Sequence, residues 1–143
     1  MRNIHAELQN AGTRRLTAQD QLRALLTKHC RTINELVEKI AGLSAQLSDA
    51  SGNPTTLVAE IREIAHQVKG SSGSIGFPDI SVAAAELDSQ LRHLIEAGNH
   101  LDSSDWQTSL FLISELQRLA KDATPERSSL YNVDISRLSP HRG

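Results

Sequence analysis

The chain has 143 residues, of which 38% are hydrophobic and 22% are charged, and this composition is typical of one soluble globular domain. The formal charge of −2, without a dense basic block, gives no reason to expect nucleic acid or a membrane surface as a partner. The apolar runs are too short for a membrane span, and the first residues lack the apolar stretch of a signal peptide. The single cysteine, Cys30, cannot form an internal disulfide, so we expect a cytoplasmic protein.

The first expected helix runs from Thr17 to Ser48 and opens with Thr17 and Asp20, which resemble a capping box. At 1.5 Å per residue it would be roughly 48 Å long, more than a compact domain requires. We therefore expect part of it to project, or the helix to break near Gly42. Its apolar positions recur every three or four residues, at Leu22, Leu26, Ile33, Leu36, Ile40, Leu43 and Leu47.

Three further helices are expected, and no segment has the pattern of a strand. The second begins near Pro54, after the loop "SDASGNP". The third has Pro78 in its first turn and ends near Gly98, while the fourth runs from Ser104 to just before Pro125. Their apolar stripes are Leu57, Ile61, Ile64, Val68 and Ile75; Ile80, Ala84, Leu87, Leu91 and Leu94; and Trp106, Leu110, Ile113, Leu116 and Ala120.

Four amphipathic helices with short connections predict an all-α fold, an antiparallel up-down four-helix bundle. The bundle would occupy residues 17–123. Residues 1–16 could add a short capping helix at one end, and residues 124–143 form a tail of mixed polarity. The sequence leaves open whether this tail packs on the bundle.

One histidine on the second helix is predicted to face away from the core. His66 lies two residues from both Ile64 and Val68, which places it about 160–200° from the apolar stripe. Gly70 and Gly73 share its face and carry no side chain that could shield it. Another protein could therefore approach the imidazole closely.

The residues around His66 suit phosphoryl chemistry. A neutral imidazole is a competent nucleophile near pH 7, and Lys69, one turn along, places an ammonium where it could pair with a phosphoryl group. The stretch "GSSGSIG" is not a nucleotide-binding loop, because no strand precedes it and no Gly-Lys-Ser/Thr ends it. No convergent histidine and carboxylate pairs indicate a metal site.

The segment "AHQVKGSSGSIGF" resembles the signature of histidine-containing phosphotransfer (HPt) domains, which runs His-x-x-Lys-Gly with small residues and further glycines following. The similarity continues through "ISVAAAELD", where that family has an alanine-containing helix ending in Leu-acidic. The resemblance implies that His66 is phosphorylated on Nε2, that Lys69 stabilises the phosphoryl group, and that Gly70 and Gly73 allow docking.

The resemblance also implies the partners, which are receiver domains of response regulators and a hybrid sensor histidine kinase. The receiver supplies the phosphorylated aspartate and Mg²⁺, so no cofactor is expected on this chain. We expect a monomeric phosphoryl carrier without ATP-dependent kinase activity, because a 143-residue helical bundle leaves no room for a kinase fold. The long first helix and the pair Pro78–Asp79 depart from the family pattern and leave the choice of partner open.

Two points stay open at this stage. Arg62 and Gln67 flank His66, and either could contact a docked partner or be a solvated surface residue. The alternative function is an interaction module that binds a kinase or receiver stoichiometrically, or dimerises through the first helix, without phosphorylation of His66.

Overall fold

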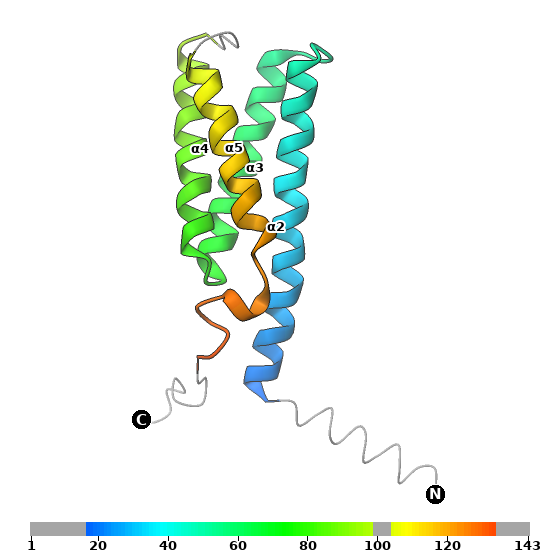
Figure 1. Cartoon of the computed structure of the whole chain (residues 1–143), viewed down its shortest axis with the longest axis vertical. Helices are drawn as coiled ribbons and strands as arrows, with labels where there is room; N and C mark the ends of the chain where they lie inside the picture. Colours follow the sequence, from blue (N-terminus) through cyan, green and yellow to red (C-terminus); the bar gives the residue numbers. More distant parts are fainter. Residues whose placement is uncertain (1–16, 99–103, 134–143) are drawn as a thin grey trace, which may run out of the picture.

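The computed structural model describes residues 17–98 and 104–133. Its helices are α2 (Ala18–Ser48), α3 (Pro54–Ser74), α4 (Pro78–Glu96) and α5 (Ser104–Lys121), followed by the 3₁₀ helix η1 (Pro125–Arg127). The four α-helices run alternately up and down (Figure 1). Helices α2 and α4 each pack against both α3 and α5. The predicted all-α up-down bundle is confirmed, whereas the capping helix predicted within residues 1–16 lies outside the described residues.

Helix α2 is continuous over 31 residues, so the alternative of a break near Gly42 is wrong. The buried side chains of Ile40 and Leu43 anchor the helix to the core on both sides of this glycine. The capping box is present: the Thr17 side chain accepts from the backbone N–H of Asp20, and the Asp20 side chain accepts from that of Thr17. The first turns of α2 extend beyond the lower end of the other helices, as one of the two alternatives predicted (Figure 1).

The predicted ends of the other helices also occur. The Asn53 side chain caps α3 by accepting from the N–H of Thr56 at 3.2 Å, and Pro54 follows at the first helical position. Pro78 occupies the same position in α4. Beyond the last turn of α4, Gly98 has a φ of 97°, the left-handed conformation that glycine adopts without strain.

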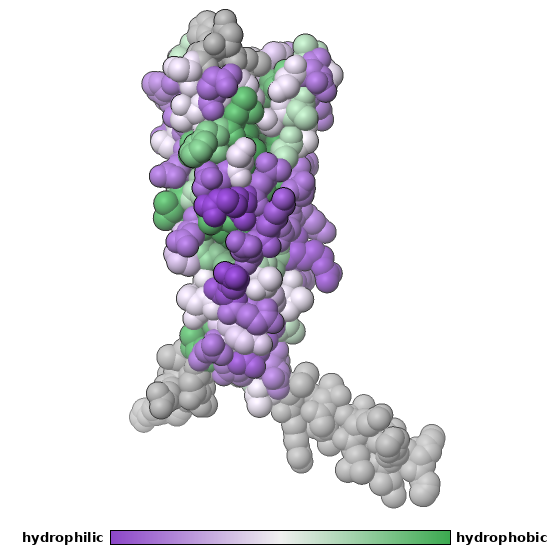
Figure 2. All heavy atoms as spheres, viewed as in Figure 1, coloured by the Kyte–Doolittle hydropathy of each residue, from purple (hydrophilic) through white to green (hydrophobic). Residues whose placement is uncertain are grey.

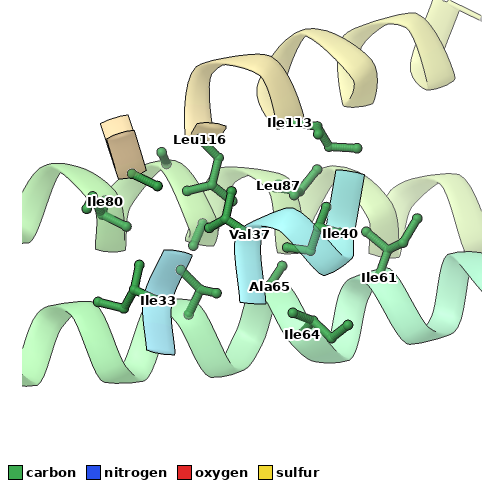
Figure 3. Close-up of a cluster of buried hydrophobic side chains, with 14 of the residues drawn as sticks. Ile33, Val37, Ile40, Ile61, Ile64, Ala65, Ile80, Leu87, Ile113 and Leu116 are labelled. Carbon is green, nitrogen blue, oxygen red and sulfur yellow. The ribbon is translucent and has the colours of Figure 1, made fainter. Parts of the chain in front are cut away.

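The core is a continuous apolar cluster to which all four helices contribute. Figure 3 shows side chains of α2, α3, α4 and α5 converging in the interior, among them Val37, Leu87 and Leu116. The predicted stripes are buried except for Leu22, Leu36 and Leu110, which are partly buried at its edge. Burial of each large aliphatic side chain contributes about 1.5–3 kcal/mol. Over the described ranges, no helix combines the length and apolar character that crossing a membrane requires.

The tail that the sequence left undecided begins with a segment that packs on the bundle. Ser128 is buried and donates its hydroxyl to the carbonyl of Ile75 at 2.6 Å. The next backbone N–H, of Ser129, donates to the carbonyl of Gly76 at 2.9 Å. These bonds attach residues 128 and 129 to the corner between α3 and α4.

The same segment also contacts the projecting end of α2. The guanidinium of Arg23 lies over the ring of Tyr131, 4.1 Å from its centre. Arg23 and Gln19 both donate to the backbone carbonyl of Tyr131. The first turns of α2 are therefore covered by residues that follow the fourth helix (Figure 1).

We predict that Gly76→Ala destabilises the protein by about 2 kcal/mol or more. Gly76 has a φ of 88°, and an added Cβ would lie 2.5 Å from the Ser128 hydroxyl and 3.0 Å from the Ser129 nitrogen. Urea unfolding measures the effect. In the control Gly42→Ala, the Cβ meets nothing within 4 Å in mid-helix, so we expect stabilisation by about 0.5–1 kcal/mol. Unfolding of Gly76→Ala at the wild-type urea concentration would contradict the prediction.

Candidate functional site

His66 lies in the middle of α3 with its side chain in solvent. Its neighbours in the chain include Ala65 and Val68, both fully buried, which fix the backbone of this turn against the core. The His66 side chain is 70% exposed, as the spacing of the apolar stripe predicted. The result is an accessible imidazole on a rigid support.

A carboxylate from α4 holds one edge of this imidazole. Nδ1 of His66 lies 3.3 Å from Oδ2 of Asp88. The other carboxylate oxygen of Asp88 accepts from Nε of Arg62 at 2.9 Å. The Asp88 side chain is only 13% exposed, so it is well shielded, whereas its two partners reach the solvent.

The contact with Asp88 decides which nitrogen of the neutral His66 imidazole keeps a free lone pair. A carboxylate only accepts hydrogen bonds, so Nδ1 must carry the hydrogen in this contact. In a neutral imidazole the lone pair then belongs to Nε2. Because Nδ1 is turned towards α4, Nε2 is the nitrogen available to an incoming group.

Charge and hydrogen bonding also act on Asp88 itself. Partial burial alone would raise the pKa of the Asp88 carboxyl. The hydrogen bonds from Arg62 and His66, together with the positive charge of Arg62 and that of His66 when it is protonated, outweigh burial and lower that pKa below its ordinary value. Asp88 is therefore an anion at neutral pH.

Lys69 and Gly70 lie beside His66 on the exposed surface of α3. Lys69 is exposed and forms no ion pair with another residue in the described ranges. A Cβ added at Gly70 would meet nothing within 4 Å, so this surface is open to a partner. Both positions fit the roles predicted for them, and those roles stay predictions.

Gly73 has a structural use that the sequence did not reveal. A Cβ at this position would lie 3.2 Å from the hydroxyl oxygen of Ser81 in α4. That hydroxyl donates to the backbone carbonyl of Lys69 at 2.9 Å. The absence of a side chain at Gly73 thus lets α4 approach α3 about two turns beyond His66.

His66 lies at the border of two grooves. The α3–α4 groove contains Arg62 and Asp88, and the α2–α3 groove contains Gln67 and Gly70. Leu25, whose side chain is exposed, lines the α2–α3 groove from the opposite helix. The residues predicted to dock a partner are thus divided: Gln67 and Gly70 line one groove, Arg62 lines the other, and Gly73 lies against Ser81 of α4.

Asp88 is the residue of the candidate site to which the sequence analysis assigned no role. It ends the segment "ISVAAAELD" and follows the buried Leu87. The one signal in the sequence was therefore an acidic residue directly after a core position. Its contact with His66 spans 22 residues and depends on the register between two helices.

The other candidate side chains in the described part of the chain form no second centre. Cys30 is buried, and burial raises the pKa of its thiol, in keeping with a packing residue. His93 lies 3.6 Å from a carboxylate oxygen of Asp105 at the α4–α5 contact. Within residues 17–98 and 104–133, no group of three or more potential ligands is arranged to hold a metal ion.

We predict that Asp88→Asn destabilises the protein by about 1 kcal/mol at pH 7, because it removes a charged hydrogen-bond acceptor. Since the pKa of Asp88 is lowered by folding, its contribution is present above about pH 5. The contribution is lost as the pH falls through the lowered value, so wild type and variant converge in acid. Urea unfolding from pH 7 to pH 3 measures this difference.

Glu38→Gln is the matched control, because Glu38 is exposed on α2 and forms no ion pair with another described residue. It should change the free energy of unfolding by less than about 0.5 kcal/mol at pH 7. If the difference in the free energy of unfolding between wild type and Asp88→Asn grew as the pH fell, the predicted direction of the pH dependence would be wrong.

Comparison with known proteins assigns the chain to a family. The family model of the Hpt domain matches residues 19–122, which include all four helices almost completely. Comparisons with curated proteins and with solved structures give no match. The matched range contains His66, Lys69 and Asp88, and it covers well over half of the sequence. The chain belongs to the Hpt domain family, the phosphotransfer modules of two-component phosphorelays.

Proposed function

We propose that this protein relays a phosphoryl group between aspartates of receiver domains through a phosphohistidine at His66. The observation that carries the proposal is the contact of Nδ1 with Asp88, which leaves Nε2 of an exposed imidazole free. Membership of the Hpt family supports a phosphotransfer role in a phosphorelay. The chain carries the group without ATP-dependent kinase activity and without a cofactor of its own.

The transfer step is a nucleophilic displacement at phosphorus. The lone pair of Nε2 attacks the phosphorus of the receiver's aspartyl phosphate, and the bond from phosphorus to the aspartate oxygen breaks. The aspartate leaves as a carboxylate, whose charge the Mg²⁺ expected on the receiver would stabilise. Nδ1 keeps its hydrogen, and Asp88 stabilises the positive charge that develops on the imidazole. Attack by the aspartate of a second receiver reverses these steps.

Lys69 would stabilise the phosphoryl group once it is on His66. Residues three apart on a helix lie side by side, and the Lys69 ammonium has a flexible stem that can reach a group on the neighbouring imidazole. Arg62 is less available for this role because its guanidinium already pairs with Asp88. The two cations therefore have different roles: Lys69 would pair with the phosphoryl group, and Arg62 neutralises the Asp88 carboxylate.

The α2–α3 groove is the surface we assign to the receiver. It adjoins His66, has an open floor at Gly70, and presents the exposed side chain of Leu25, which is 48% accessible. Apolar contacts of this kind are favourable at the centre of a protein interface. Gln67 lies in the same groove and offers a polar contact at its edge.

We predict that His66→Gln abolishes phosphorylation of the protein and leaves the fold intact, because the exposed His66 side chain contributes little to the core. The assay is transfer from a panel of labelled phospho-receiver domains, with circular dichroism as the control for folding. The label on wild type should be labile in acid and stable in base, as expected of a phosphoramidate.

Two results would count against this proposal. Labelling of His66→Gln to the wild-type level would place the phosphoacceptor elsewhere. Wild type that binds a receiver but never accepts the group would favour the alternative, a stoichiometric interaction module.

We predict that Lys69→Ala slows transfer about fivefold to tenfold while receiver binding is retained, because an exposed charge pair contributes about 1 kcal/mol. Single-turnover transfer kinetics measure the rate, and titration with unphosphorylated receiver measures the binding. Lys121→Ala, at the far end of α5, removes an equal charge away from His66 and should leave both values unchanged. Equal rates for Lys69→Ala and Lys121→Ala would remove Lys69 from the mechanism.

A further inference from the structure

The exposed apolar side chains fall in two separate places. Across the described ranges, the large hydrophobic residues that are exposed are Leu25, Val82 and Phe111. Leu25 lines the α2–α3 groove beside His66, whereas Val82 and Phe111 line a second groove between α4 and α5. Val82 is 59% exposed and Phe111 63%, so the second groove presents two large exposed apolar side chains where the first presents one.

Phe111 is unusual within this chain. The sequence has only four aromatic residues. Trp106 and Phe77 are buried, and Tyr131 stacks on Arg23, so Phe111 is the ring left in solvent. Because an exposed phenyl ring costs free energy in water, a partner that covers it would gain that energy on binding.

The helical spacing of α4 and α5 directs Val82 and Phe111 to the surface, where they line the groove. Val82 lies two residues from the buried Ile80 and Ala84, and Phe111 lies two residues from the buried Ile113. At about 100° per residue, each side chain therefore points away from the buried face of its helix. Figure 2 shows apolar side chains interrupting the hydrophilic surface on the side where α5 faces the viewer.

The rim of this groove is acidic. Asp79 and Glu86 line it and form no ion pair with another described residue. Glu115 lies on the opposite side and is paired with Arg118 at 2.7 Å. Since Arg118 is the cation that lines this groove and Glu115 already neutralises it, the surface keeps a net negative charge around an apolar centre.

The groove is separate from the His66 site. On α4, Val82 and Glu86 lie roughly 120–160° around the helix from Asp88, which contacts His66. Helix α5 packs against α2 and α4, whereas His66 belongs to α3. A molecule seated between α4 and α5 therefore leaves His66 and the α2–α3 groove accessible.

We propose that the α4–α5 groove docks an amphipathic helix of a partner protein, with apolar residues on Val82 and Phe111 and Lys or Arg side chains opposite Asp79 and Glu86. The charge pattern favours this occupant over a second copy of the chain, because a symmetric dimer would bring these carboxylates against one another. Such a partner would hold the protein in a complex while its histidine stays accessible. The proposal stands independently of phosphorylation at His66.

The test uses the full chain and a fluorescent helical peptide of roughly 18 residues, with leucines spaced along one face and lysines beside them. A twin peptide carries glutamate at every lysine. We expect the lysine peptide to bind at least tenfold more tightly than its twin, and Phe111→Ala to weaken that binding about tenfold. Glu86→Lys should weaken it about fivefold and reduce its salt dependence.

Leu25→Ala is the matched control, because it removes an exposed apolar side chain from the other groove. It should leave peptide binding unchanged, and Phe111→Ala should leave phosphoryl transfer unchanged, which separates this proposal from the proposed function. Equal binding of both peptides, or binding that depends on Leu25 and not on Phe111, would overturn the proposal. Light scattering that reveals a dimer dissociated by Phe111→Ala would also overturn it, since the occupant would then be a second copy.

Discussion

Asp88 gives the two edges of the His66 imidazole different roles, and the chemistry of the site depends on this division. One ring nitrogen is bound to a shielded carboxylate, and the other faces solvent. If His66 accepts a phosphoryl group, as we propose, a neighbouring carboxylate would by itself repel that incoming anionic group. Here Arg62 balances that charge from the far side of Asp88, so the carboxylate can orient the ring without dominating the local field.

The close approach of α3 and α4 makes this contact possible. Asp88 is short, so α4 must lie near α3 for its carboxylate to reach the ring. The missing side chain of Gly73 and the hydroxyl of Ser81 bring the two backbones together about two turns away from the His66–Asp88 contact. A glycine in the exposed part of a helix would otherwise only weaken it. In this protein it sets the spacing between the helix that carries the histidine and the helix that orients it.

The sequence predicted what depends on periodicity within a helix. The outward direction of His66, the buried stripes and the helix ends all follow from local spacing and capping residues. The role of Asp88 could not be predicted in this way, because contacts between helices depend on their relative register. The same holds for Ser81, and for Arg62, whose partner lies on another helix.

The packed position of residues 125–133 was also beyond the sequence pattern. This segment has no apolar period, and its attachment depends on a few specific bonds, such as that from Ser128 to Ile75. Its aromatic residue contributes by stacking on Arg23. Such contacts involve particular atoms, whereas composition and hydrophobic spacing describe only averages over many residues.

These bonds mean that the folded unit and the family match have different ends. The match stops at residue 122, within one residue of the end of α5, but hydrogen bonds continue to tie the chain to the bundle up to Asn132, whose side-chain oxygen accepts from Arg23. A fragment cut at the family boundary would leave the Ile75 carbonyl without its serine and the first turns of α2 uncovered. The last packed residues therefore close the lower end of the bundle, because they hold both the first turns of α2 and the turn that follows the helix carrying His66.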